Sequence, residues 1–595
     1  MCGICAVIQL EKDVSVNYLN EELVNKLRRR GPDHFQKTTA TYKKITSCFC
    51  SSVLHLRGSS IEKQPFKNEK GGILMWNGQI FDNDFAASEN MSDTRVLGEM
   101  LFKCVSITDV LDVIQCIRGP YAFVFYQSNG LLWFGRDIFG RRSLLWNAEK
   151  FILRLSSVAY GKANWSEVPT EGIFCLDLNA SCANDSFIIF KYPWTSAVSG
   201  LPLKKVPLEE MSLNIKFEIK LEMCLINPIS VQLNREIPDD DDVNLDLNMV
   251  EENCQAKQET LCKLLNKTAM IEIVERFEEV LSEAVRKRVS NQQHLCKSCY
   301  TLLNPKETEV ICDHAPTGIL FSGGLDSIVI ACLADRHLDQ NQPIDLINVA
   351  FAAAPSLKNS KTVFDTPDRI TGRNGFKSLG NVCPARKWNF VEVNVTKDEL
   401  ILKRKETLSD LLKPSNTVLD DSIGCALWFA AHGEGVISST EGNHNYKSPA
   451  RVLLVGMGAD EQLAGYSRHR GKFSVAGWSG LIEEISLEID RIGSRNLGRD
   501  DRIIADNGVE SRYPFLDENV VCFLNGLPIW FKANLNYPRG IGEKLLLRLL
   551  AFKLGLTEAA MLPKRAIQFG SRIARIENNK EKGSDVCDRL SNIET

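Results

Sequence analysis

Short apolar runs alternate with polar turns along residues 1–190. The runs are rich in β-branched and aromatic residues and are interrupted by Gly, Asn and Asp, which predicts short strands. They are CAVIQL, SVLHLRG, ILMWNGQIF, YAFVFYQ, LLWFGRD and SLLWN. Two stretches with helical spacing of apolar positions, NEELVNKLRRR and TRVLGEMLFKC, lie between them. We therefore expect an α+β region with layered sheets.

The pattern changes between residues 191 and 265, where glycine motifs are sparse. Four aspartates, Asp239–Asp242, follow Pro238 in this segment. We expect the segment to be a linker or an insertion. Its acidic run is typical of a solvated loop rather than of a cation site.

Strand-like and helix-like runs alternate from residue 266 onward. Residues 271–289 place apolar side chains on one helical face. The strand-like runs GILF, IDLINVAF, WNFVEVNV and RVLLV follow, with IVIACLADRHL and IGCALWFAAH between them. This alternation predicts a doubly wound parallel sheet, so the expected fold class is α/β overall. The pattern further predicts a mostly helical part over 479–570 and a polar tail over 574–595.

Composition narrows the classes of function. The chain has 595 residues, 44% apolar and 25% charged, and its 71 Lys and Arg nearly balance 75 Asp and Glu. This is typical of a multidomain globular protein, without the basic excess of a nucleic-acid binder or the ~20-residue apolar run of a membrane helix. The odd number of 19 cysteines indicates reduced thiols. We therefore expect a cytoplasmic protein with neither a nucleic-acid nor a membrane partner.

The first five residues, MCGIC, place a cysteine directly after the initiator methionine. Removal of Met1 would leave Cys2 with a thiol and a free α-amine that titrates near neutrality. Nucleophile and base would then belong to one residue. A small second residue without catalytic meaning is the alternative, and these five residues alone do not separate the two.

The hexapeptide SGGLDS, Ser322–Ser327, lies between the strand GILF and the helix IVIACLA. Its glycines allow backbone N–H groups to approach an anion, its serines add hydroxyl donors, and the helix N-terminus adds its positive end. Asp326 would repel a phosphate unless it held a bridging Mg²⁺. The stretch RVLLVGMGADE offers a second carboxylate, Asp460, at another strand end, where it could share that ion. A paired acid on a loop, Asp460 and Glu461, is the alternative.

A cluster of metal-ligand residue types occupies the irregular segment 291–315. His294, Cys296, Cys299, Cys312 and His314 contain a C-x-x-C pair followed by C-x-H, and these residue types suit zinc. The spacing is loose and cysteines occur throughout the chain. We therefore expect reduced thiols without zinc here, and we keep a zinc site as the alternative.

SGGLDS and GMGADE together resemble the synthetase domain of the asparagine synthetase family. RDDRIIADNGVESRYPFLD (499–517) and GEKLLLR (542–548) resemble it as well. The resemblance implies an ATP pyrophosphatase-type domain over 266–573 that adenylates a carboxylate, with Mg²⁺ on Asp326 and Asp460. The ATP- and pyrophosphate-binding residues that it implies are Leu320, Ser322, Gly323, Gly324, Leu325, Asp326, Ser327, Val349, Gly456 and Lys544.

The N-terminal region resembles the class II glutamine amidotransferase domain that precedes the synthetase domain in this family. The matching stretches are MCGIC, RRRGPD (28–33), HLR (55–57), WNGQI (76–80), SDT (92–94) and the structural strand pair GRDIFGRRSLLW (135–146). The resemblance implies an Ntn-hydrolase-type αββα domain over 2–190 with Cys2 as the nucleophile. It assigns Arg57 to the glutamine carboxylate, Asp93 to the glutamine ammonium, and Asn77 and Gly78 to the oxyanion.

The chain departs from the family pattern at three positions. The oxyanion motif usually reads N-G-E, and Gln79 replaces the glutamate that helps to bind the glutamine ammonium. In the S-G-E-G motif, Val455 replaces the serine that meets ATP, and Met457 replaces the glutamate thought to deprotonate ammonia. Loss of a general base typically costs about 10²–10⁴-fold in rate.

The implied reaction is glutamine hydrolysis to ammonia, ATP-dependent adenylation of a carboxylate, by resemblance aspartate, and amidation to asparagine. The expected small-molecule partners are glutamine, ATP with Mg²⁺, and aspartate. Two alternatives follow from Met457: a nucleotide-binding scaffold that has lost synthesis, and a glutaminase uncoupled from synthesis.

Overall fold

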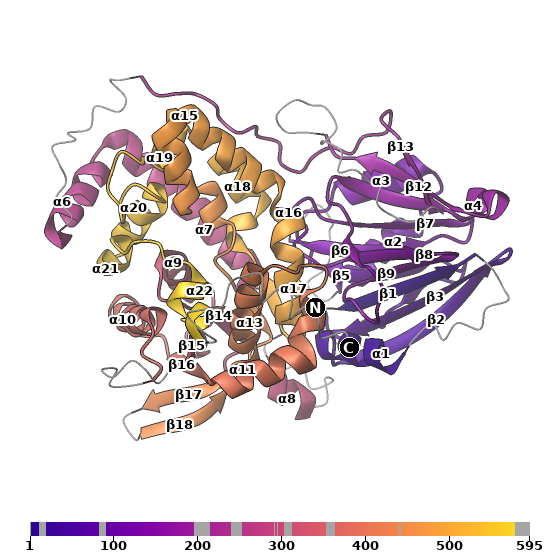
Figure 1. Ribbon diagram of the computed structural model, residues 1–595, viewed down its shortest axis with the longest axis horizontal. Coiled ribbons are helices and arrows are strands. Elements are labelled where there is room, and N and C mark those ends of the chain that lie inside the picture. The colour runs from indigo at the N-terminus through magenta and orange to yellow at the C-terminus, as the bar shows by residue number, and fades with distance from the viewer. Residues whose placement is uncertain are drawn as a thin grey trace.

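The computed structural model describes residues 2–10, 20–81, 91–195, 215–239, 253–290, 292–293, 295–302, 312–352, 363–439 and 442–576. These residues form two domains that lie side by side (Figure 1). The N-terminal domain contains two stacked sheets, and the C-terminal domain contains one sheet covered by helices. The expected α/β class, with an αββα domain followed by a doubly wound domain, is confirmed.

Side-chain alternation explains the layers of the N-terminal domain. In β1, Ile4, Ala6 and Ile8 point into the core between the two sheets, whereas Cys5 and Val7 pack on the other face with α1. Strand β5 alternates in the same way, and its second apolar face lies under α2 and α3. The strands β1 and β5 are therefore buried on both faces, and the layers follow the order αββα.

The N-terminal elements follow the chain in this order: β1 Gly3–Gln9, α1 Glu21–Arg30, β2 His34–Tyr42, β3 Ile45–Val53, β4 Phe66–Lys67, β5 Ile73–Gly78, α2 Asp93–Leu101, α3 Ile107–Gln115, β6 Tyr121–Tyr126, β7 Leu131–Arg136, β8 Leu145–Glu149, β9 Ile152–Ser156, β10 Ser166–Glu167, β11 Gly172–Asp177, α4 Leu178–Asn184, β12 Phe187–Pro193 and β13 Ile215–Ile219. The two sheets have the strand orders β10-β8-β9-β1-β3-β2 and β13-β12-β11-β7-β6-β5-β4.

The segment expected as a linker or insertion is partly built into both domains. Strand β13 pairs in parallel with β12 and extends the second sheet. Beyond it, the Asn234 amide donates to the Asn525 carbonyl at 2.7 Å in the C-terminal domain. Helix α6 buries Leu261 and Leu264 in the C-terminal core. Asp239 is exposed, and the other three aspartates of the acidic run lie outside the described residues.

The C-terminal sheet has the strand order β18-β17-β16-β15-β14-β19-β20. The five strands β16, β15, β14, β19 and β20 run parallel. Strands β17 and β18 form an antiparallel hairpin at the edge next to β16. The chain order reverses between β14 and β19, so the loops that follow these two strands meet in one crevice. SGGLDS and GMGADE are those two loops.

The C-terminal elements are α6 Cys254–Leu265, α7 Thr268–Val289, α8 Lys297–Leu302, β14 Thr317–Leu320, α9 Leu325–Asp335, β15 Ile344–Phe351, α10 Pro367–Val382, β16 Trp388–Val395, α11 Lys397–Lys403, α12 Ser409–Leu412, α13 Val418–His432, β17 Glu434–Ser439, β18 Gly442–Lys447, β19 Val452–Leu454, α14 Ala459–Gln462, α15 Ser467–Asp490, α16 Ile492–Arg495, α17 Leu497–Ala505, β20 Glu510–Arg512, α18 Glu518–Gly526, α19 Ile529–Lys532, α20 Leu545–Lys553, α21 Thr557–Ala560, α22 Ile567–Gly570 and α23 Ile573–Ile576. The helix expected at 271–289 is α7, whose apolar face lies in the core.

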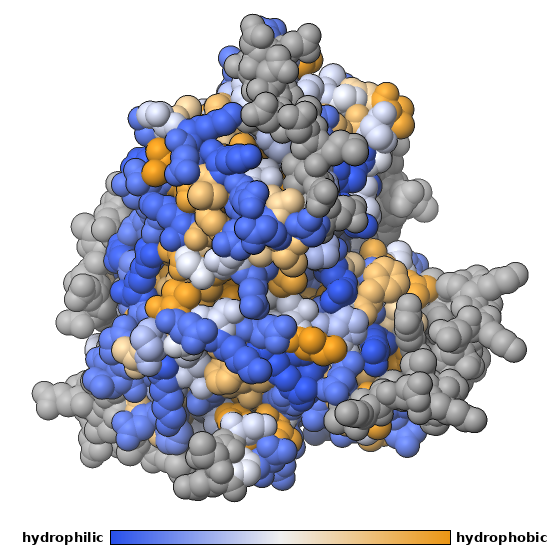
Figure 2. All heavy atoms as spheres, turned by 90° about the vertical axis from the view of Figure 1, so that its left-hand side faces the viewer, coloured by the Kyte–Doolittle hydropathy of each residue, from blue (hydrophilic) through white to orange (hydrophobic). Residues whose placement is uncertain are grey.

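The outward face of the C-terminal domain is mostly hydrophilic, with apolar side chains in small scattered groups (Figure 2). Among the described residues, no helix has both the length and the apolarity to cross a membrane.

Candidate active sites

Cys2 and Asn77 meet between the two N-terminal sheets. Cys2 directly precedes β1, and Asn77 lies near the end of β5. The Cys2 backbone N–H donates to Asn77 Oδ1 at 3.0 Å. Asn77 is fully buried, and its Nδ2 has no hydrogen-bond partner among the described residues. A buried amide donor beside a thiol can bind an oxyanion that forms there.

Gln64 contacts the Cys2 thiol, although it was not among the residues predicted from the sequence. Its Nε2 lies 3.6 Å from Cys2 Sγ and donates to Thr94 Oγ1 at 3.0 Å. Its Oε1 accepts from the Trp76 amide at 2.7 Å, which fixes the orientation of the side chain. Burial raises the pKa of the Cys2 thiol, and the positive amino terminus opposes that shift. Gln64 belongs to none of the recognised motifs, so no local signal marks it.

Arg57 and Asp93 form an ion pair next to this site. Arg57 Nη1 donates to Asp93 Oδ1 at 2.6 Å, and Asp93 Oδ2 accepts from the Ile80 amide at 3.0 Å. Burial raises the pKa of the Asp93 carboxyl to about 6, although Arg57 opposes the shift. A cation and an anion side by side can bind the carboxylate and the ammonium group of a free amino acid. Gln79 is buried close by, but its neutral amide adds no charge.

Gly78 follows Asn77 at the end of β5, and its position excludes any side chain. A Cβ there would lie 2.6 Å from the Pro120 carbonyl oxygen and 2.7 Å from the Trp76 ring. The predicted glutamine-site residues Cys2, Arg57, Asn77, Gly78, Gln79 and Asp93 therefore share one region of the N-terminal domain.

The SGGLDS loop connects β14 to α9, as the sequence predicts. Gly323 has a positive φ of 72°, and a Cβ on it would lie 2.3 Å from the Thr371 carbonyl oxygen. The Gly324 amide donates to Ser322 Oγ at 3.2 Å, and Ser327 Oγ donates to the Gly324 carbonyl at 3.1 Å. Leu320 ends β14, Leu325 begins α9 and Val349 lies in β15. The loop thus directs the N-terminus of an apolar, buried helix toward the crevice.

Asp326 and Asp460 converge on one lysine. Lys544 Nζ lies 2.7 Å from both Asp326 carboxylate oxygens and 2.6 Å from Asp460 Oδ1. Lys564, which was not among the predicted residues, pairs with Asp460 Oδ2. Burial alone would raise the pKa of Asp460, but the two lysines outweigh burial and hold it well below its usual range. A Cβ on Gly456 would lie 2.9 Å from Asp326 Cβ, which brings this predicted residue into the same crevice.

Two pockets flank Lys564. The first is lined by the SGGLDS loop and by cationic side chains from residues 544–565; its residues include Ser322, Gly324, Asp326, Lys544, Arg548, Lys564 and Arg565. The second lies on the other side of Lys564 and includes Tyr466, Arg470, Arg539 and Glu543. Positive charge in both pockets suits anionic ligands.

Met457 and Glu461 differ in their surroundings. Met457 packs partly buried against an apolar cluster, and its thioether accepts no proton at neutral pH. Glu461 is buried, and its two oxygens accept hydrogen bonds from the Gly458 amide at 3.1 Å and the Tyr466 hydroxyl at 2.6 Å. Glu461 therefore holds the loop together.

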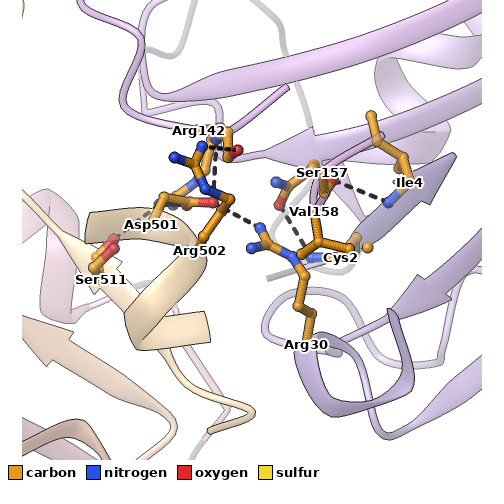
Figure 3. Close-up of polar contacts among 12 residues, drawn as sticks. Cys2, Ile4, Arg30, Arg142, Ser157, Val158, Asp501, Arg502 and Ser511 are labelled. Carbon is orange, nitrogen blue, oxygen red and sulfur yellow. Dashed lines mark hydrogen bonds and ion pairs between the residues drawn. The ribbon is translucent and has the colours of Figure 1, made fainter. Parts of the chain in front are cut away.

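Buried ion pairs join the two domains beside Cys2. Arg30, at the end of α1, points toward Asp501 on α17 (Figure 3), and Arg30 Nη2 donates to Asp501 Oδ2 at 2.7 Å. Both side chains are fully buried. Further pairs between the domains are Asp33–Arg451, Arg141–Glu518, Arg142–Glu510 and Glu167–Arg502. The motifs RRRGPD and GRDIFGRRSLLW thus supply the domain interface as well as local structure.

The structure also gathers Cys296, Cys299, Cys312 and His314, whose ligand atoms all lie within 4.8 Å of one another. His294, considered with them, lies outside the described residues.

Comparisons with known proteins divide the chain in the same way. The family described as "Glutamine amidotransferase domain" matches residues 1–166, and the family described as "Asparagine synthase" matches residues 311–379 and 474–573. The chain is 44% identical to "Asparagine synthetase domain-containing protein 1" of Homo sapiens, over 99% of this chain and 98% of that protein. The Bos taurus protein of that name is 42% identical, over 100% of this chain and 99% of that protein. "Asparagine synthetase domain-containing protein CG17486" of Drosophila melanogaster is 34% identical, over 99% and 100%.

Proposed function

Because the chain belongs to the family of asparagine synthetase domain-containing protein 1, we propose that it couples glutamine hydrolysis to ATP-dependent amidation of a carboxylate. Aspartate is the proposed acceptor, and asparagine is the proposed product. The observation that carries this proposal is the contact between Cys2 and Asn77, whose Oδ1 accepts from the Cys2 amide while its buried Nδ2 remains available as a donor.

The first proposed half-reaction takes place at Cys2. After removal of Met1, the Cys2 α-amine accepts the thiol proton, and the thiolate attacks the glutamine amide carbon. Asn77 Nδ2 and the Gly78 amide stabilise the oxyanion, ammonia leaves, and water hydrolyses the thioester to glutamate. Arg57 and Asp93 exchange their mutual ion pair for the carboxylate and the ammonium of glutamine.

The second proposed half-reaction takes place in the crevice after β14 and β19. Asp326 and Asp460 present oxygen ligands that converge on Lys544 Nζ, and this donor set fits Mg²⁺. When bound, Mg²⁺ would neutralise charge on the ATP phosphates. Lys544 and Lys564 bind phosphate oxygens, and the SGGLDS loop directs backbone N–H groups toward them. The neighbouring pocket with Arg470 and Arg539 suits an acceptor with two carboxylates.

Met457 favours a second candidate function, a glutaminase uncoupled from synthesis. The chain keeps the residues of the family's glutamine-site motifs except the glutamate, which Gln79 replaces. The synthetase site, in contrast, has no carboxylate at position 457 to accept a proton from ammonia. In this case ammonia would be released without amide formation.

The test is a mass-spectrometric assay of the purified chain with glutamine, Mg·ATP and aspartate. The matched pair of variants is Cys2→Ala and Cys116→Ala, because Cys116 is exposed and lies outside the site. Asparagine and AMP that depend on glutamine in the parent and in Cys116→Ala, but not in Cys2→Ala, would support coupled synthesis. Glutamate without AMP would support the uncoupled glutaminase, and neither glutamate nor AMP would contradict both functions.

A further inference from the structure

Three cysteines and one histidine converge at the start of α8 and just before β14. Cys296 and Cys299 are at the helix start, and Cys312 and His314 precede the strand. Their ligand atoms lie within 4.8 Å of one another, and Cys299 Sγ is 3.4 Å from His314 Nδ1. Zn–S distances of about 2.3 Å and Zn–N distances of about 2.0–2.1 Å place tetrahedral ligands about 3.5–3.8 Å apart. The four side chains therefore require only small adjustments to surround one ion.

Backbone N–H groups donate hydrogen bonds to two of the sulfur atoms. The Cys296 N–H donates to Cys312 Sγ at 3.2 Å, and the Cys299 N–H donates to Cys296 Sγ at 3.4 Å. Hydrogen bonds to a charged group stabilise the charged state, and thiolates are the form of cysteine that binds metal ions.

We infer that Cys296, Cys299, Cys312 and His314 bind a structural divalent metal ion, which the soft ligand set identifies as zinc. Three thiolates and one imidazole complete a closed tetrahedral site with no position left for substrate. Binding releases three thiol protons to solvent, and His314 coordinates through a ring nitrogen lone pair.

The small apolar core of this segment is consistent with stabilisation by a structural metal ion. Among the described residues, its buried cluster contains Leu295, Cys296, Tyr300 and Cys312, with Cys299 packed against it. Small structural units commonly rely on a metal ion to add to the stability of such a small cluster.

The metal-bound segment braces the glutamine site against the C-terminal domain. Tyr300, on α8, places its hydroxyl 2.7 Å from His55 Nδ1, and His55 Nε2 lies 3.0 Å from the Gly58 carbonyl. Because a carbonyl only accepts, Nε2 carries the proton and Nδ1 accepts from Tyr300. Arg451 lies over the Tyr300 ring at 4.2 Å and donates to the His55 carbonyl at 2.8 Å. His55 is two residues from Arg57, so the ion stabilises the backbone that carries a proposed glutamine contact.

Metal content tests the inference without reference to activity. The full chain, expressed with zinc and then desalted, should contain about one zinc ion by mass spectrometry of the metals. Cys296→Ser/Cys299→Ser should lose it, whereas Cys254→Ser/Cys262→Ser, which removes two exposed thiols from α6, should retain it. No zinc in the parent chain, equal zinc in both double variants, or a disulfide between any two of the three cysteines would overturn the inference.

Substitutions of His314 keep the test decisive if the double variant fails to fold. His314→Ala should weaken zinc affinity by at least about tenfold, and His314→Cys should restore it. Cobalt added to chelator-treated parent chain should give thiolate charge-transfer bands and intense tetrahedral d–d bands, both shifted in His314→Cys. Unchanged affinity in His314→Ala would contradict the proposed ligand set.

The bracing role rests on the proposed function, and it has its own readout. Chelation should increase deuterium uptake by residues 54–58 and raise the KM for glutamine more than it lowers kcat. If zinc binds but chelation changes neither the deuterium uptake nor the KM for glutamine, the metal site is supported and only the bracing role is rejected.

Discussion

At the residue scale, opposite charges neutralise each other at the positions where substrate charges are expected. Arg57 pairs with Asp93, and Lys544 pairs with Asp326 and Asp460. Each pairing keeps a buried charge from standing alone, which would otherwise cost several kcal/mol. A ligand that carries both signs can replace such a pair without leaving a charge unbalanced.

Asp93 should make glutamine binding depend on pH. Its pKa is raised to about 6 by burial, so it loses its charge as the pH falls through that value. We expect the KM for glutamine to rise about tenfold from pH 7 to pH 5, because the ammonium then lacks its carboxylate partner. Asp93→Asn should have a high KM that is flat over this range. A parent KM that does not change, measured by glutamate release, would contradict this role.

Met457→Glu should restore a proton acceptor at the position of the missing base. If the proposed synthesis is limited there, amide formation from free ammonia, aspartate and Mg·ATP should rise by about 10²–10⁴-fold. Met457→Gln, which has similar size and no basic carboxylate, is the matched control. Equal rates in the Glu and Gln variants would show that ammonia is deprotonated elsewhere.

At the element scale, the sharp turn between β14 and α9 depends on glycine. Gly323 combines a positive φ with close contact to the Thr371 backbone, and α10 carries that residue. A side chain there must displace α10 as well as strain the turn, so the SGGLDS loop and α10 pack as one unit.

Gly323→Ala should therefore abolish nucleotide binding, measured by titration calorimetry with Mg·ATP. Gly161→Ala is the matched control, because Gly161 has a similar φ of 64° but no atom within 4 Å of the point that a Cβ would occupy. The control should cost about 1–2 kcal/mol of stability from backbone strain alone and bind nucleotide normally. Nucleotide binding by Gly323→Ala with parental affinity would contradict the close packing.

At the scale of the whole molecule, the two domains share a buried ionic interface. Arg30, Arg141 and Arg142 come from the N-terminal domain, and their carboxylate partners Asp501, Glu518 and Glu510 come from the C-terminal domain. Paired buried charges fix the relative orientation of the two domains, because a shift of one domain against the other would leave a buried charge without its partner. This interface lies directly beside Cys2 (Figure 3), so under the proposed function it would also determine where ammonia released at Cys2 meets the second domain.

Arg30→Met should destabilise the chain by about 3 kcal/mol, because the buried Asp501 carboxylate then loses its shorter ion pair and keeps only Arg142, at 3.5 Å, as a charged partner. Arg276→Ala is the control, because it breaks an exposed pair with Glu279 and should cost less than about 1 kcal/mol. Arg30→Met/Asp501→Leu should recover part of the loss. Equal chemical denaturation midpoints for Arg30→Met and Arg276→Ala would contradict a buried interdomain pair.

Local patterns in the sequence determined much of this protein. Alternating apolar positions predicted the strands, and SGGLDS, HLR and WNGQI placed Asp326, Arg57 and Asn77, because period and turn chemistry act over a few residues. Only the tertiary structure brought Gln64 to Cys2, Lys564 to Asp460 and Arg451 to Asp33, since each contact joins residues far apart in the chain. The four proposed zinc ligands show the same limit. Their loose spacing in the sequence does not reveal that their ligand atoms lie together in the tertiary structure.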